Sequence, residues 1–156
     1  MTTYEKSLNV LRELFAKDYQ FALATSNNNI PSVRLVDTFY DKGYFYIVTY
    51  AKSQKVKDIE KNPEVSMCNK LFRFSGTAYN IGHPLSEKNH EIREKLIRVF
   101  DPWYFAHNNE NDEHMCYVKV KIKQGFFYKD GTGYKVDFEK REAEEFPFTF
   151  DIVVVE

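Results

Sequence analysis

The chain has 156 residues, a formal net charge of −1 at pH 7 and an aromatic content of 17%. A nearly neutral chain has no general attraction to nucleic acid or to an anionic membrane, which argues against both as partners. No apolar run reaches membrane-spanning length and the first residues lack a signal-peptide layout, so we expect a cytoplasmic protein. The length predicts one domain spanning residues 1–156.

The first half of the chain combines two helical patterns with three strand patterns. Apolar residues at helical spacing predict an amphipathic helix over residues 3–17. Alternating apolar residues separated by turn-forming stretches predict strands at 19–25, 32–40 and 44–50. Turns this short join neighbours in an antiparallel meander. A short helix is expected at 54–61, because Asn62-Pro63 ends it.

The second half contains further strands around one long helix. Strands are expected at 64–71 and 73–79, and Gly76 in the latter indicates a bulge or a close backbone approach. Ser86 is expected to cap a helix over 87–100, which Asp101-Pro102 ends before a polar loop. Later segments predict strands at 115–123, 126–129 and 134–139, with a hairpin turn at 130–133. The apolar tail 146–155, after a charged run, is either a last strand or a partner-binding arm.

Six or seven antiparallel strands interrupted by a few helices predict a mainly β (α+β) fold. A β-barrel with flanking helices accommodates them, and an open α+β sheet is the alternative. Closure is favoured because no segment has the features of a protected edge strand.

The cysteines and histidines point to no separate chemistry. Cys68 and Cys116 each lie in a strand-like segment, and we expect both to be buried, reduced and unreactive. Metal-ligand spacing is missing among the four histidines, which are His83, His90, His107 and His114. Hydrolase, P-loop and dinucleotide-binding motifs are also missing from the sequence. We therefore predict neither a metal site nor a catalytic nucleophile.

The joint between the strand 44–50 and the helix 54–61 is the best candidate for an anion site. Ser53 stands at the N-cap position, where its hydroxyl can accept a backbone N–H, and Lys52 and Lys55 flank it. A helix N-terminus offers free N–H donors and the positive end of a dipole, which suit a phosphate. The alternative is that Lys52, Lys55 and Lys57 are only the solvent-exposed face of a small helix.

Arg34 in the middle of the strand 32–40 is the second cationic candidate. The turn 41–43 pairs its strand with the one that ends near Thr49, so Arg34 is expected to approach Ser53 and Lys55. A guanidinium group binds phosphate through two parallel hydrogen bonds. The alternative is an arginine on the solvent face of an edge strand.

These residues resemble a known family. The segments V-R-L-V-D, F-Y-I-V-T-Y-A-K-S-Q-K and I-E-K-N-P-E-V-S are similar to the FMN-binding split-barrel superfamily related to pyridoxamine 5′-phosphate oxidase, best over residues 21–76. The resemblance implies a split barrel in which the arginine and the start of the helix bind the FMN phosphate, while strand backbone lies along the isoalloxazine ring. The implied FMN contacts are Arg34, Leu35, Val36, Asp37, Val48, Thr49, Ser53, Gln54 and Lys55.

The chain also departs from the pattern of the oxidases proper. Gln54 stands where the family often has arginine, and Thr38 lies near a position where the oxidases have lysine. The C-terminal segment rich in Trp and Arg is missing as well. The closer likeness is therefore to short members of the general-stress and nitroimidazole-resistance type, and not to a true pyridoxamine-phosphate oxidase.

The resemblance implies a homodimer with flavin at the interface, where each subunit lends aromatic residues to the other's ring. Trp103, Tyr104 and Phe105 are the candidates for that role, and plain interface or core packing is the alternative.

The implied function is that of an FMN-dependent oxidoreductase. It would pass electrons from NADH or NADPH to a small-molecule substrate, an oxidised acceptor of the nitroaromatic or quinone type. No catalytic side chain is predicted, because the cofactor supplies the chemistry. His107 or His114 as a proton donor near the flavin is the alternative to solvated loop histidines. One alternative is a non-catalytic flavin- or haem-binding protein that sequesters or senses its ligand. Another is a ligand-free barrel that serves as an interaction module.

Overall fold

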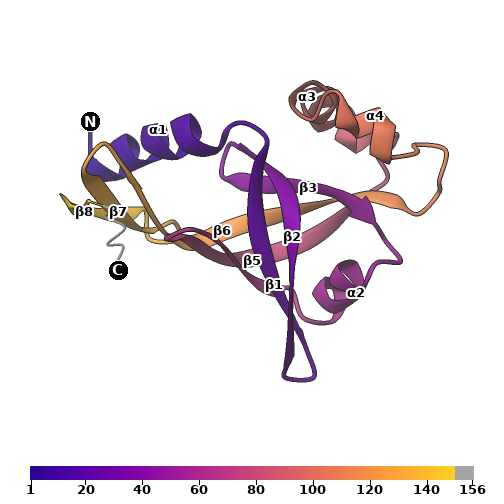
Figure 1. Cartoon of the computed structure of the whole chain (residues 1–156), viewed down its shortest axis with the longest axis horizontal. Helices are drawn as coiled ribbons and strands as arrows, with labels where there is room; N and C mark the ends of the chain where they lie inside the picture. Colours follow the sequence, from indigo (N-terminus) through magenta and orange to yellow (C-terminus); the bar gives the residue numbers. More distant parts are fainter. Residues whose placement is uncertain (150–156) are drawn as a thin grey trace, which may run out of the picture.

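The computed structural model describes residues 1–149 as antiparallel strands with helices on their outer side (Figure 1). The strands are β1 Tyr19–Asn27, β2 Ile30–Asp41, β3 Tyr44–Tyr50, β4 Glu64–Asn69, β5 Phe72–Gly82, β6 Met115–Lys129, β7 Thr132–Asp137 and β8 Glu142–Pro147. The helices are α1 Thr3–Phe15, α2 Gln54–Lys61, a 3₁₀ turn Glu87–Asn89, α3 His90–Val99 and α4 Trp103–His107.

Six of the strands close into a barrel. Their order is β3-β2-β1-β4-β5-β6, and β3 pairs with β6 to complete the ring, with Tyr44–Tyr50 against Met115–Lys121. The second half of β6 also pairs with β7, and β7 with β8, so these two strands extend the sheet beyond the barrel. The predicted antiparallel barrel is confirmed, with two strands added to its six.

The helix α1 closes one end of the barrel. A capping box fixes its start, since Thr2 accepts the Glu5 backbone N–H and the Glu5 carboxylate accepts that of Thr2. Leu11 and Phe15 are fully buried. The Phe15 ring lies 5.0–5.8 Å from the rings of Tyr19, Phe21, Phe45, Phe72 and Phe74. Much of the high aromatic content therefore fills the barrel core.

The segment 83–114, which we call the helical lobe, covers the outer face of β2, β3 and β6 (Figure 1). Its core combines residues of the helical segment with strand residues. The helical segment supplies Leu96, Phe100 and Tyr104, and the strands supply Phe39, Met115 and Tyr117. Because α3 and α4 bury these apolar side chains against the barrel, the lobe is a fixed part of the fold next to β3.

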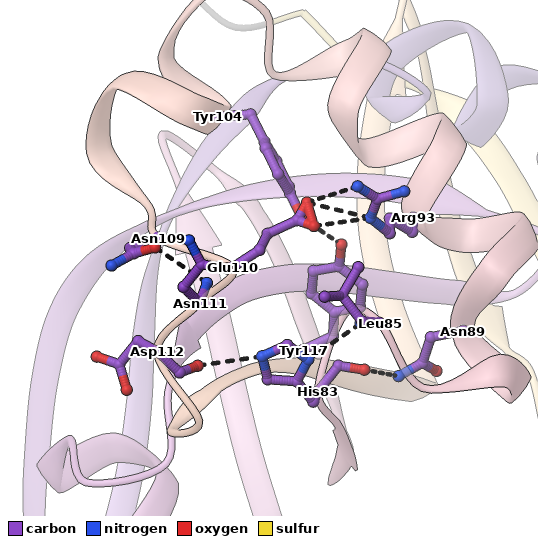
Figure 2. A network of polar contacts seen from close by, with 10 residues as sticks. All are labelled: His83, Leu85, Asn89, Arg93, Tyr104, Asn109, Glu110, Asn111, Asp112 and Tyr117. Carbon is purple, nitrogen blue, oxygen red and sulfur yellow. Dashed lines mark hydrogen bonds and ion pairs between the residues drawn. The ribbon is translucent and has the colours of Figure 1, made fainter.

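A polar network holds the lobe in place (Figure 2). Arg93 forms a forked ion pair with Glu110, with Nε and NH2 each 2.8 Å from a carboxylate oxygen. His83 Nδ1 accepts the Leu85 backbone N–H at 3.1 Å, so its Nε2 carries the proton and donates to the Asp112 carbonyl at 3.1 Å. The loop 107–114 is thus tied both to α3 and to the end of β5.

Several local predictions need correction. The predicted helix 87–100 begins as a 3₁₀ turn and becomes an α-helix at His90, and α1 ends two residues earlier than predicted. The break at Asp101-Pro102 is confirmed, but α4 follows at once, because burying Tyr104 beneath the lobe stabilises one more helical turn.

The C-terminal part also differs from the prediction. The structure forms one continuous β6 where two strands were expected, and β8 lies in the charged run, with Glu142 and Glu144 exposed along an edge strand that tolerates them. The tail prediction concerns residues that fall mostly outside the described range, since 150–156 are not described.

Two single-residue predictions had opposite outcomes. The close approach at Gly76 is confirmed, because a Cβ there would lie 2.3 Å from the Lys121 carbonyl oxygen at a register shift between β5 and β6. The expected burial of Cys68 is wrong, since it is exposed on β4, whereas Cys116 is buried. Burial raises the pKa of the Cys116 thiol to about 11, which keeps it protonated.

Candidate functional site

The candidate site lies where β2 and β3 part. The two strands pair only from Phe39↔Tyr46 to Asp41↔Tyr44. Beyond that point β3 continues along β6 and β2 along β1, so the facing edges of β2 from Ile30 to Thr38 and of β3 from Ile47 to Tyr50 have no partner strand among residues 1–149. Figure 1 shows the two strands diverging. The predicted site residues of both strands line these open edges, and an open edge presents backbone N–H and C=O groups.

The N-terminus of α2 faces the end of β3. Ser53 is the N-cap residue, with extended backbone angles, but its hydroxyl donates to the Tyr50 carbonyl at 2.7 Å. The prediction that this hydroxyl accepts a helix N–H is therefore wrong. The first helical hydrogen bond runs from Lys57 N to Ser53 O, so the preceding N–H groups of α2 are left without an intrahelical acceptor. They can receive an anion.

Of the three lysines near this point, one is turned toward β3. Lys55 is half-buried and donates to Thr49 Oγ1 at 3.0 Å, and Thr49 Oγ1 lies 3.5 Å from Ser53 Oγ. Burial and the nearby charge of Arg34 lower the pKa of Lys55. Lys52 and Lys57 are exposed, which matches the solvent-face alternative for them alone.

Arg34 points inward and is not a solvent-face residue. Its side chain is 23% exposed, and NH1 donates to Thr25 Oγ1 at 2.7 Å and to the Leu23 carbonyl at 3.3 Å. NH2 lies 3.7 Å from Asp58 Oδ2. Two partly buried cations, one of which lowers the pKa of the other, fit the donor set that a phosphate group requires together with the hydroxyls and free N–H groups beside them.

Sequence reasoning missed two residues of this cluster, Thr25 and Asp58. Both are almost fully buried, and Asp58 also accepts a hydrogen bond from the side-chain amide of Gln54 at 2.7 Å, so one N–H of that amide is already bonded. The signal was available in the sequence. Thr25 continues the inward-facing positions of Phe21 and Leu23, and Asp58 lies between the buried Val56 and Ile59. A polar residue at an apolar position usually has a partner.

A second polar cluster lies on the outer face of β2. Burial and the neighbouring Asp18 carboxylate raise the pKa of Asp37 to about 6. Trp103 donates its indole N–H to Asp18 Oδ2 at 2.8 Å and stacks on Phe100 with 4.5 Å between ring centroids. Trp103 thus already has partners in its own chain.

The other two aromatic candidates, Tyr104 and Phe105, differ in how far they are exposed. Tyr104 is buried and bonds to the hydroxyl of Tyr117, which matches the core-packing alternative. Phe105 is 58% exposed and stays available to a partner.

The cationic cluster is partly exposed in the single chain, since Arg34 and Lys55 are each only partly buried. Two cavities, of about 850 and 600 Å³, lie elsewhere, one on the outer face of the sheet and one between α1 and the β2–β3 turn. Within residues 1–149, no group of three His, Cys, Asp or Glu is placed to hold a metal ion. No helix in that range is long and apolar enough to span a membrane.

These observations agree with comparison to known proteins. A family model described as pyridoxamine 5′-phosphate oxidase matches residues 9–129, and the chain therefore belongs to that family. A search of curated proteins found no match. The predicted family resemblance is confirmed.

Solved structures share the fold at low sequence identity. A NimC/NimA family protein from Clostridium acetobutylicum is 21% identical, with a TM-score of 0.56 and 95% of each chain covered. General Stress Protein 26 from Bacillus anthracis is 21% identical with a TM-score of 0.55, covering 81% of this chain and 93% of its own. A pyridoxamine 5′-phosphate oxidase-related, FMN-binding protein from Nostoc punctiforme is 11% identical with a TM-score of 0.56, covering 96% of this chain and 98% of its own.

Proposed function

We propose that this protein binds FMN and passes electrons from NADH or NADPH to a small oxidised acceptor of the nitroaromatic or quinone type. The observation that carries the proposal is the convergence of Arg34, Lys55 and the α2 N-terminus beside the open edges of β2 and β3. Membership of a family with flavin-binding relatives supports the choice of ligand.

The chain's residues divide into two groups by their position. Arg34, Thr49, Ser53 and Lys55, with the N–H of Gln54, would hold the phosphate at the start of α2. The open edge from Leu35 to Asp37, with Val48 opposite, would hold the flat ring through backbone groups. FMN, when bound, supplies the electron-transfer chemistry, and the protein binds, orients and shields it.

We further propose that the functional unit is a homodimer. The open edge of β2 carries Ile30, Val33 and Leu35, which are 67%, 69% and 66% exposed. An apolar strand edge of this kind favours pairing or packing with another chain. A second copy placed there would cover the open side of the cationic cluster and of the ring site.

The proposal is tested by spectroscopy on the purified protein. We expect the absorption spectrum of bound flavin, a saturable FMN titration, and flavin reduction when NADH or NADPH is added. Arg34→Ala and Lys55→Ala should each weaken FMN binding about ten- to a hundredfold, because each removes charge-assisted hydrogen bonds. Lys57→Ala removes an equal charge from the exposed side of the same helix and should leave binding unchanged. A colourless protein that ignores added FMN contradicts the proposal.

The second candidate is a flavin- or haem-binding protein that sequesters or senses without turnover. It is favoured by one observation: in the cationic cluster the polar side chains of Arg34, Ser53 and Lys55 already have hydrogen-bond partners within the chain. Steady-state consumption of nicotinamide with an acceptor decides between the two. Rapid turnover excludes this candidate, and a flavin that stays oxidised with both nicotinamides favours it.

A further inference from the structure

A buried carboxylate lies directly behind the cationic cluster. Asp58 on α2 is 1% exposed, and both of its oxygens are hydrogen-bonded. Thr25 Oγ1 donates to Oδ2 at 2.8 Å, and Gln54 Nε2 donates to Oδ1 at 2.7 Å. The hydrogen bonds from Gln54 and Thr25 keep the pKa of Asp58 below its usual value, so the group is ionised at neutral pH.

This ionised carboxylate fixes the direction of a short hydrogen-bond chain. A carboxylate only accepts hydrogen bonds, so the Thr25 hydroxyl must donate to it. The lone pairs of the same hydroxyl are then free to accept from Arg34 NH1, which lies 2.7 Å away. The order Asp58, Thr25, Arg34 thus links helix α2 to strand β2 through β1.

The chain leaves a defined part of the guanidinium for an anion. Both N–H groups of NH1 have acceptors, namely Thr25 Oγ1 and the Leu23 carbonyl. Because the guanidinium is planar and rigid, holding NH1 also sets the direction of Nε and NH2. Nε and NH2 make no hydrogen bond within the described residues, although NH2 lies 3.7 Å from Asp58 Oδ2, so these two nitrogens are the donors that a phosphate oxygen can approach.

We propose that Asp58 is a positioning residue for the phosphate site, acting through Thr25 to aim Arg34. The inference rests on the proposed function, since it describes how the chain holds a phosphate group. In this role Asp58 strengthens phosphate binding, whereas its negative charge alone would weaken it. A negative charge 3.7 Å from Arg34 weakens the attraction for an anion, so a purely electrostatic role predicts tighter phosphate binding once the charge is removed.

The test compares three ligands with different chemistry: FMN, riboflavin, which lacks the phosphate, and inorganic phosphate. Binding is followed by flavin fluorescence, and for inorganic phosphate by NMR of the Arg34 side-chain N–H. Asp58→Asn keeps the shape of the side chain but offers an N–H to Thr25, which frees the hydroxyl from its fixed direction. We expect FMN and phosphate to bind about tenfold more weakly, and riboflavin to bind as before, on the scale found when a partner that orients a ligand-binding side chain is removed.

Two further variants make the result specific. Glu60→Gln removes one negative charge from the exposed side of the same helix and should not weaken FMN binding. Thr25→Val should reproduce the loss, and Thr25→Ser, which keeps the hydroxyl, should restore binding. The two Thr25 variants test the proposal even if Asp58→Asn fails to fold.

The possible outcomes separate the inference from the function on which it rests. Unchanged or tighter FMN binding by Asp58→Asn overturns the positioning role, and so does an equal loss of FMN and riboflavin. A wild-type protein that binds phosphate but not FMN refutes the proposed function, while the variants still score the inference through phosphate. A wild-type protein that binds neither overturns both.

Discussion

Trp103 and Asp18 are 85 residues apart in the chain and are joined by a hydrogen bond of 2.8 Å from the indole N–H to the carboxylate. This contact ties the helical lobe to the turn between α1 and β1. Asp18 also faces Asp37, so a tryptophan, a carboxylate and a second, protonatable carboxyl form one cluster. Trp103 is the only tryptophan of the 156-residue chain, and its fluorescence therefore reports on this cluster.

The first prediction concerns the pH dependence of that cluster. The pKa of Asp37 is raised from 3.8 to about 6, so the folded state holds its proton more tightly than the unfolded state. The stabilisation that comes from the more tightly held proton of Asp37 is fully present below about pH 4 and is lost as the pH rises through about 6. We expect Trp103 fluorescence to titrate with a midpoint near 6, and Asp37→Asn to remove that transition.

The same variant should change the stability profile. Asp37→Asn should raise the melting temperature relative to wild type at about pH 7.5 and change it little at about pH 4, because the protonated acid resembles the amide. Asp101→Asn removes an exposed acid close to Trp103 and should not alter the fluorescence transition. A flat fluorescence signal between about pH 5 and 7 would contradict this account.

The second prediction concerns the anchor of the lobe. Glu110→Gln breaks a forked ion pair whose carboxylate is 10% exposed and whose guanidinium is 28% exposed. We expect a loss of about 2 kcal/mol in the free energy of unfolding, at the low end for a buried pair because water can reach Arg93. Urea denaturation measures it. The double variant with Arg93→Met should lose less than the sum of the two single losses, and strict additivity would show that the pair is not coupled.

The third prediction tests the close approach of β5 and β6. Gly76→Ala would place a Cβ 2.3 Å from the Lys121 carbonyl oxygen, which belongs to the backbone and cannot rotate away. We expect a loss of about 3 kcal/mol, at the upper end for overpacking. Ser75→Ala at the neighbouring position is the control and should cost less than 1 kcal/mol, since surface or half-buried truncations are mild. Equal stability of the two variants would contradict the contact.

The fourth prediction tests the homodimer. Leu35→Glu places a charge on the open edge of β2 and should raise the dimer dissociation constant about thirtyfold or more. Leu71→Glu changes another exposed leucine, in the turn between β4 and β5, and should leave the dimer intact. Light scattering coupled to size-exclusion chromatography measures both. If the wild type is monomeric, or if both variants dissociate alike, the interface lies elsewhere.

The sequence allowed the barrel to be predicted because its local signals are strong. β3 and α2 appear within the residues expected for them, and their strand-to-helix joint placed Lys55 beside Thr49. Arg34 was expected near that joint, and its NH2 lies 3.7 Å from Asp58 Oδ2 on α2. The contact between Lys55 and Thr49 joins residues only 6 positions apart, which is why local signals could identify it.

The failures have a common physical cause, which is dependence on distant contacts. α4 forms because Tyr104 is buried against Tyr117, and β8 forms because β7 offers it an edge, so neither has a strong local signal. Thr25 and Asp58 meet only when β1 lies against α2. The Ser53 hydroxyl donates to the nearby Tyr50 carbonyl and does not make the N-cap hydrogen bond that its position favours.

The closure of β3 on β6 has a consequence for how the chain is made. When Tyr50 leaves the ribosome, the strand that will flank it, from Met115 onward, has not yet been synthesised. The packing of α1 is completed later still, because Lys6 pairs with Glu145 on β8. Until then Phe15, Phe21 and Phe45 lack the strands that bury them in the finished barrel. Exposed aromatic side chains of this kind are the surface that chaperones shield in incompletely folded chains.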